Sequence, residues 1–178
     1  MTNNENKNRR DLFDKIAAEY DRKIDRARAL AETAARSVAC AVWADSERMP
    51  PDRLRALGGQ VLDWDPWFKR GRKAATNWAI KIAVNELSRD MATAFDGLRR
   101  YGSINCLPKR SRGAYDRAHT VLLALMWWEP SRLTYIRALG AFNNAVDLLE
   151  NRQKRLWEQV DAQERLTKKT AVDTLEKV

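Results

Sequence analysis

The first part of the chain carries an apolar side chain at every third or fourth position, the spacing that places residues on one face of an α-helix. The pattern predicts a helix from about Asp11 to Ser46, preceded by a polar segment, residues 1–10, that is expected to be disordered. In the second half of this helix the apolar residues are mostly alanine. Because small side chains let a neighbouring helix approach closely, we expect a tight helix crossing at residues 27–35.

Proline and glycine divide the middle of the chain. Pro50 and Pro51 end the first helix, and a short second helix is expected to stop at Gly58 and the glycine after it. The acid before Pro66 is a capping residue followed by a proline at the first helical position, which is typical of a helix start. A third helix is therefore predicted from this point to about Arg100.

The last third of the chain predicts two more helices. Residues 101–113 contain two glycines and a proline and are expected to form a loop. A fourth helix is predicted from about Ala114 until Pro130 breaks it. A fifth is predicted from that proline towards the C-terminus, because apolar residues alternate at spacings of three and four over residues 139–160, the a/d pattern of a coiled coil. Residues 166–178 are expected to fray.

These patterns predict an all-α fold: a bundle of about five helices, with long first, third and fifth helices, in one domain over residues 11–165. Seven glycines and five prolines in 178 residues are too few for the turns of a many-stranded sheet. The longest apolar run is too short to cross a membrane, and the N-terminus lacks the apolar stretch of a secretory signal. We therefore expect a cytoplasmic protein that does not bind membranes.

Residues that carry catalytic or metal chemistry are scarce. His119 is the only histidine, and Cys40 and Cys106 define neither a disulfide framework nor a zinc-binding spacing. No glycine-rich phosphate loop or paired-cysteine redox motif is present. We expect no enzymatic activity, no cofactor and no bound metal, and a structural role for the histidine.

Positive charge is concentrated in the middle of the chain. The net charge is +9, and residues 66–128 hold 12 lysines and arginines against 4 acids. Residues 1–65 are balanced at 12 of each, and residues 129–178 hold 9 basic and 8 acidic side chains. Arginine, whose N–H groups match phosphate oxygens in pairs, outnumbers lysine 22 to 11. This local excess favours binding of a phosphate backbone over the alternative, a solvated face that only maintains solubility.

The candidate phosphate contacts lie in two basic clusters, at residues 67–73 and 109–112, and along a polar stripe of the third helix that includes Ser88. Most of the seven tryptophans are expected to fill the core, but Trp67 adjoins the first cluster and could stack on a base. The candidate nucleic-acid-binding residues are Trp67, Lys69, Arg70, Arg72, Lys73, Lys81, Arg99, Arg100, Lys109, Arg110, Arg112 and Arg117.

These observations favour a non-catalytic subunit that binds a nucleic-acid backbone, with single-stranded RNA or DNA preferred. It is expected to contact other subunits, or copies of itself, through its first, third and fifth helices. In size, helicity and basicity the chain resembles, in outline, the small helical subunits of CRISPR effector complexes or a helical nucleocapsid protein, which implies a place in a nucleoprotein assembly. Two alternatives stay open: a helical adaptor for an acidic protein, and a helix-turn-helix DNA-binding regulator, although the spacer at residues 63–67 is long for that motif.

Overall fold

The computed structural model describes residues 3–52 and 76–175, and within these ranges it contains five α-helices and no strand. The all-α bundle predicted from the sequence is confirmed. The helices are α1 (Asn3–Arg48), α3 (Thr76–Tyr101), α4 (Lys109–Leu125), α5 (Arg132–Leu149) and α6 (Arg152–Leu175), and a short 3-10 helix, η2 (Ile104–Cys106), joins α3 to α4. The expected second helix and the start of the third lie mostly outside the described residues.

The first helix is longer than its apolar pattern predicted. It begins at Asn3, so residues 3–10 are helical rather than the disordered tail that we expected. Long-range ion pairs contribute to this result: the guanidinium of Arg9 lies 2.5 Å from a carboxylate oxygen of Asp161 and 3.7 Å from one of Glu164, both on α6. The polar first turns are therefore held by contacts that a local apolar pattern does not record.

The prediction of one continuous fifth helix is wrong. The structure has two helices there, α5 and α6, and the chain turns between them at Asn151, whose φ is +56°. Asparagine is one of the few residues besides glycine that adopt this left-handed conformation readily. The apolar spacing continues across the break, since α5 and α6 both pack against α1. α6 also remains helical to Leu175, beyond the point where fraying was expected.

The fourth helix begins five residues earlier than predicted, at Lys109. Pro108 occupies its N-cap position in an extended conformation. The basic residues 109–112 therefore form the first turn of α4 and not a loop, as their composition had suggested.

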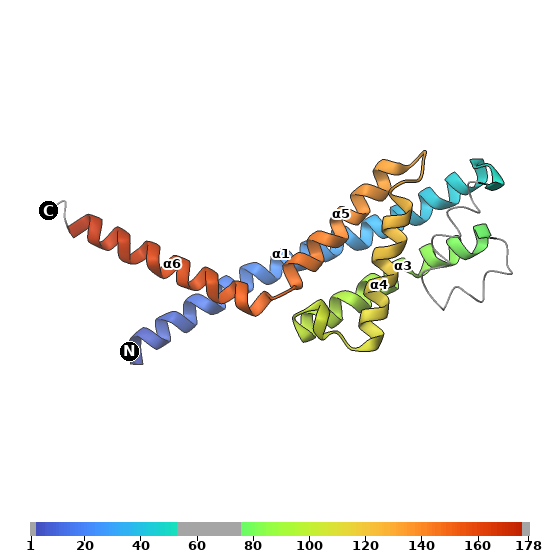
Figure 1. Ribbon diagram of the computed structural model, residues 1–178. Helices are drawn as coiled ribbons and strands as arrows, with labels where there is room; N and C mark the ends of the chain where they lie inside the picture. Colours follow the sequence, from blue (N-terminus) through green and yellow to red (C-terminus); the bar gives the residue numbers. More distant parts are fainter. Residues whose placement is uncertain (1–2, 53–75, 176–178) are drawn as a thin grey trace.

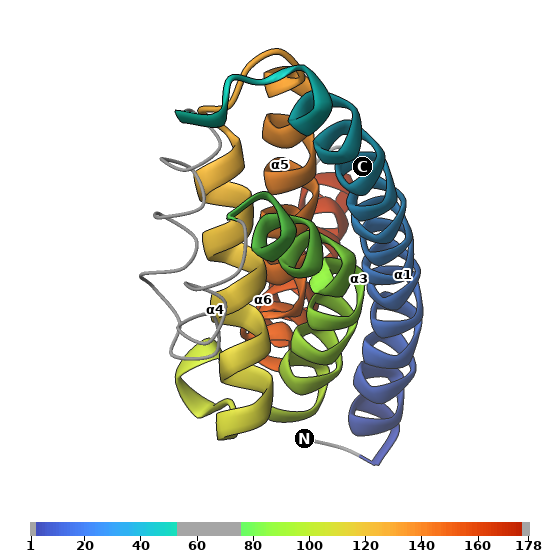
Figure 2. The same ribbon diagram turned by 90° about the vertical axis from the view of Figure 1, so that its right-hand side faces the viewer.

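Figure 1 shows an elongated molecule in which α1 runs most of the length and α5 and α6 follow one another antiparallel to it. The C-terminal part of α1 packs with α3, α4 and α5 into a four-helix bundle, and Figure 2 shows these three helices gathered beside it. At the other end, residues 3–23 of α1 lie beside α6 and extend away from the bundle (Figure 1), and Tyr20 also donates its hydroxyl to the carbonyl of Leu148 on α5 at 3.0 Å. We call this two-helix extension the arm.

The core follows the apolar seams that the sequence predicted. Ala27, Ala31 and Ala35 of α1 are almost fully buried, in agreement with the close helix crossing expected at residues 27–35. Large side chains from the opposing helices complete the interior, among them Phe95 of α3 and Phe142 of α5, whose ring centroids lie 5.6 Å apart. Burial of these faces provides most of the driving force for folding.

α3 and α4 approach closely at Gly97. A Cβ atom added there would lie 2.5 Å from Cβ of Ser111 and 3.0 Å from Cδ2 of Leu107. We expect Gly97→Ala to force the two helices apart and to lower the free energy of unfolding by about 1–2 kcal/mol, despite the better helix propensity of alanine. Urea unfolding followed by circular dichroism measures this change.

Gly140 of α5 provides the matched control, because a Cβ atom there would meet nothing within 4 Å. Gly140→Ala is expected to raise the free energy of unfolding by up to about 1 kcal/mol. A second change, Ser111→Gly, should restore part of the stability that Gly97→Ala removes, since it deletes the clashing atom. Equal effects of the two alanine substitutions would contradict the close approach at Gly97.

Candidate nucleic-acid interface

The structure separates the candidate contact residues by their surroundings. Five of them, at the first basic cluster, lie outside the described residues: Trp67, Lys69, Arg70, Arg72 and Lys73. The other seven are described, and they divide into cations held by neighbouring helices and cations that face solvent.

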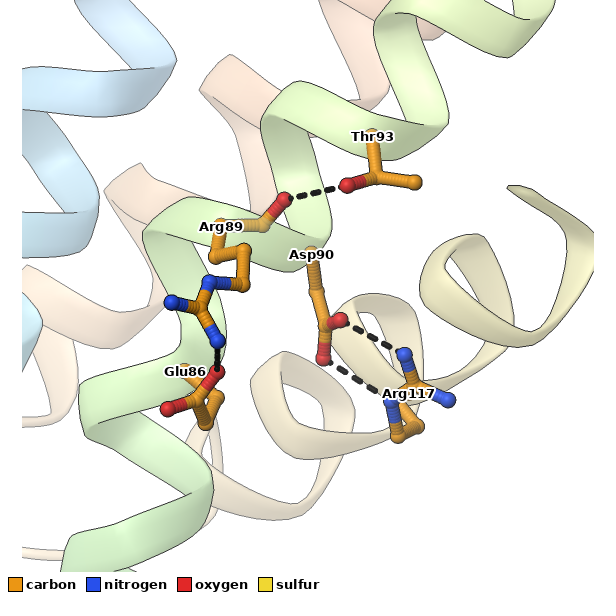
Figure 3. Close-up of polar contacts among 5 residues, drawn as sticks. All are labelled: Glu86, Arg89, Asp90, Thr93 and Arg117. Atoms are coloured by element: carbon orange, nitrogen blue, oxygen red, sulfur yellow. Dashed lines mark hydrogen bonds and ion pairs between the residues drawn. The ribbon is translucent and has the colours of Figure 1, made fainter. Parts of the chain in front are cut away.

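Arg117 is one of the cations that are held by a neighbouring helix. Its Nε and Nη2 atoms donate to the two carboxylate oxygens of Asp90 at 2.9 and 2.7 Å, as Figure 3 shows. Asp90 is buried on α3, so this pair joins α4 to α3 across the bundle. Figure 3 also shows Arg89 paired with Glu86 at 3.1 Å within α3. The geometry therefore favours a structural role for Arg117, where the charge pattern had suggested a phosphate contact.

Two cations of the polar stripe along the third helix also contact residues of another helix. Nζ of Lys81 lies 3.9 Å from the ring centroid of Trp43, and Nη1 of Arg99 lies 3.6 Å from a carboxylate oxygen of Asp25. Trp43 and Asp25 are both on α1. Lys81 and Arg99 thus flank the contact between α1 and α3, rather than lining the open phosphate-tracking surface that we expected.

The cations that face solvent gather where α3 turns into α4. Residues 99–112, which we call the basic turn, contain five lysines and arginines and no acid. Two of the five have a carboxylate partner: Arg99 pairs with Asp25 of α1, as above, and Nε of Arg112 lies 3.0 Å from a carboxylate oxygen of Asp116. Arg100, Lys109 and Arg110 are exposed and form no ion pair with any described side chain.

The backbone of the basic turn is fixed by the break between α5 and α6. Gly102 ends α3 with φ +77°, a conformation that glycine adopts without strain, and its N–H donates to the carbonyl of Leu98 at 2.8 Å. Its own carbonyl accepts from the N–H of Asn151 at 2.6 Å. The Glu150 carboxylate accepts from the hydroxyl of Ser103 at 3.3 Å and from the next backbone N–H at 3.4 Å.

The start of α4 is electrostatically unusual. Its N-cap, Pro108, has no side chain that could accept a hydrogen bond from the first turn, and that turn contains no acid. It contains instead the cations Lys109, Arg110 and Arg112, although the N-terminus of a helix already carries partial positive charge. Each cation at this end costs a few tenths of a kcal/mol to about 1 kcal/mol. A bound anion would relieve this repulsion and accept from the free N–H groups.

Tyr101 is a member of this surface that sequence reasoning missed. Its side chain is 44% exposed, and the guanidinium carbon of Arg100 lies 5.6 Å from its ring centroid. An exposed ring beside an arginine offers a platform on which a nucleic-acid base can stack. Its position directly after two arginines was a usable signal, but the tryptophans drew the interpretation to Trp67 instead.

Two tyrosines and the histidine belong to the packing of the helices rather than to this surface. Burial raises the pKa of Tyr115, and His119 stacks on this ring at a centroid distance of 5.8 Å. Burial and a hydrogen bond to Asp45 raise the pKa of Tyr135 far above 10. Among residues 3–52 and 76–175, no group of three histidine, cysteine or acidic side chains could hold a metal ion. None of the described helices is long and apolar enough to cross a membrane.

The basic turn is therefore the part of the described surface where unpaired positive charge, an uncapped helix start and an exposed aromatic ring occur together. Comparisons with known proteins add no assignment to this geometry: no family model, no curated protein and no solved structure matches the chain.

Proposed function

We propose that this protein is a non-catalytic subunit that binds the phosphate backbone of a nucleic acid through the basic turn. The observation that carries the proposal is the trio Arg100, Lys109 and Arg110, exposed and without an ion pair among the described residues, around the uncapped start of α4. Positive charge that no acid neutralises attracts a polyanion, and arginine forms paired hydrogen bonds with phosphate oxygens.

Single-stranded RNA or DNA is the form that this surface fits best. Tyr101 adjoins the cations, and in a single strand the base faces are free to stack on an aromatic ring. Lysine and arginine side chains contact the phosphates of any sequence, so contacts would be made mainly to phosphates and show little base specificity. The contribution to an assembly would be to hold a strand, not to read or cut it.

The proposal is tested by removing the three unpaired charges together. The variant Arg100→Gln/Lys109→Gln/Arg110→Gln is expected to bind a labelled single-stranded oligonucleotide about 10- to 100-fold more weakly than the parent chain. Because each phosphate contact in a single strand contributes about 0.7 to the slope of log K against log salt, the slope should fall by about 2. Fluorescence anisotropy between about 50 and 200 mM salt measures both quantities.

A matched control removes the same charge elsewhere. Arg36, Arg137 and Arg165 are exposed side chains on α1, α5 and α6, and changing all three to glutamine lowers the net charge of +9 by the same amount. This control should retain nearly the full affinity and salt slope. Equal losses in the two triple variants would show diffuse charge attraction and reject the basic turn as the site. Absence of binding by the parent chain at low salt would reject the function itself.

A further inference from the structure

One face of the first half of α1 is only partly covered by the other helices and shows a regular pattern. Its residues follow spacings of 4, 3, 4, 3 and 4, so they share one side of the helix. The first two are partly buried, the next three are exposed, and the last, a leucine, is 63% exposed. In order they are Leu12, Ile16, Glu19, Lys23, Arg26 and Leu30.

A hollow of about 310 Å³ lies beside this face, between α1 and α6. Ile16, Glu19 and Lys23 line it from α1, and α6 contributes among others Gln163 and Leu166. Leu166 is 65% exposed. The arm thus presents a groove that combines apolar, amide and charged side chains, which is the kind of surface that receives another helix.

The charge pattern of this face is complementary to itself when the helix is reversed. If a second α1 is laid antiparallel on the first, with the two-fold axis at Asp21, Leu12 of one copy faces Leu30 of the other. In the same register Glu19 faces Lys23 of the second copy, and the symmetry makes each of these contacts twice. Ile16 faces the aliphatic stem of Arg26, which completes the register.

We propose that the arm is a self-association surface, and that a second copy of this chain occupies its groove with the two α1 helices antiparallel. If the partner had an unrelated sequence, nothing would explain why the leucines and the opposite charges of this face match one another in a single antiparallel register. Within one chain, Glu19 and Lys23 lie 3.5 Å apart but are both more than half exposed, so their pair is weak and can exchange across an interface. The matched contacts, from Leu12 to Leu30, would span about 27 Å of helix.

Light scattering coupled to size-exclusion chromatography gives the first test. The parent chain should elute with twice its 20.5 kDa mass, and Leu30→Glu should shift it to the monomer mass. The dissociation constant of the dimer should be at least tenfold lower for the parent chain than for this variant. Leu133→Glu is the control, since this leucine is 59% exposed on α5 and lies away from the groove, so the dimer should persist. A monomeric parent chain, or a dimer that ignores Leu30→Glu, would overturn the proposal.

A charge exchange tests the register itself. Glu19→Lys alone and Lys23→Glu alone each place like charges opposite one another, so each variant should be monomeric by native mass spectrometry. Mixed together, the two variants restore opposite charges at both contacts and should form a heterodimer, although each chain keeps its own internal repulsion. Failure of the mixture to associate would overturn the antiparallel register. No nucleic acid is needed, so this outcome is independent of the proposed binding function.

Discussion

Replacing Asp45 by alanine is expected to lower the free energy of unfolding by about 3–5 kcal/mol. The Asp45 side chain is buried at 2% exposure, and it accepts three hydrogen bonds that join the end of α1 to the start of α5. The hydroxyl of Tyr135 donates at 2.7 Å, and Ser131 donates through its hydroxyl at 2.9 Å and its backbone N–H at 3.2 Å. Removing the carboxylate takes away the acceptor to which the fully buried Tyr135 hydroxyl donates, which is the larger part of the cost.

A double substitution separates this cost from simple loss of volume. Tyr135→Phe removes the fully buried donor, so adding it to Asp45→Ala should recover part of the lost stability, because the Tyr135 hydroxyl is then no longer present to be left unsatisfied. Urea denaturation of the parent, the two single variants and the double variant measures the coupling. A loss below about 1 kcal/mol in Asp45→Ala would show that the network is not closed as described.

Arg117→Ala is expected to lower the free energy of unfolding by about 2–4 kcal/mol while leaving the affinity for single-stranded nucleic acid unchanged. The substitution leaves Asp90 buried without its paired donors, and the cost is below that of a fully buried pair because the Arg117 side chain is 28% exposed. A double-mutant cycle with Asp90→Ala should show a coupling energy of about 1 kcal/mol or more.

The same variant decides between two roles for Arg117. Stability is read from chemical denaturation, and affinity from anisotropy at a temperature where the variant is folded. An unchanged unfolding free energy together with a weaker affinity would place Arg117 at the nucleic-acid interface after all, as the charge pattern alone had suggested.

The fold class was predictable because helix formation is recorded locally, in the spacing of apolar residues. The breaks were harder to predict. The turn at Asn151 depends on contacts with Gly102 and Ser103, which lie far away in the sequence. Apolar spacing runs through that turn without interruption, so periodicity alone favours one long helix. The start of α4 had a local signal in Pro108, but the basic residues that follow were interpreted as loop composition.

The sequence was enough to predict which region of the chain holds the candidate site, but not which of its residues face solvent. Charge counts located the excess, since they depend only on composition. They could not show that Arg117 is neutralised by Asp90, 27 residues away, or that Asp25 of α1 approaches Arg99. Ion pairing of this kind is set by helix packing, so sequence alone cannot separate structural cations from free ones. Tyr101 had a local signal in the two arginines before it, but its exposure depends on how α3 ends.

The hydrogen bonds between the Glu150–Asn151 turn and residues 102–104 have a mechanical consequence. They join the start of α6 directly to the backbone between Arg100 and Lys109, so α6 is connected to the surface that we propose binds phosphate. A movement of α6 must therefore be transmitted to that backbone or break these bonds. Linkage between two sites is reciprocal. Any occupant of the arm that shifts the turn would therefore change the affinity for a nucleic-acid strand by the same factor by which the strand changes the affinity for that occupant.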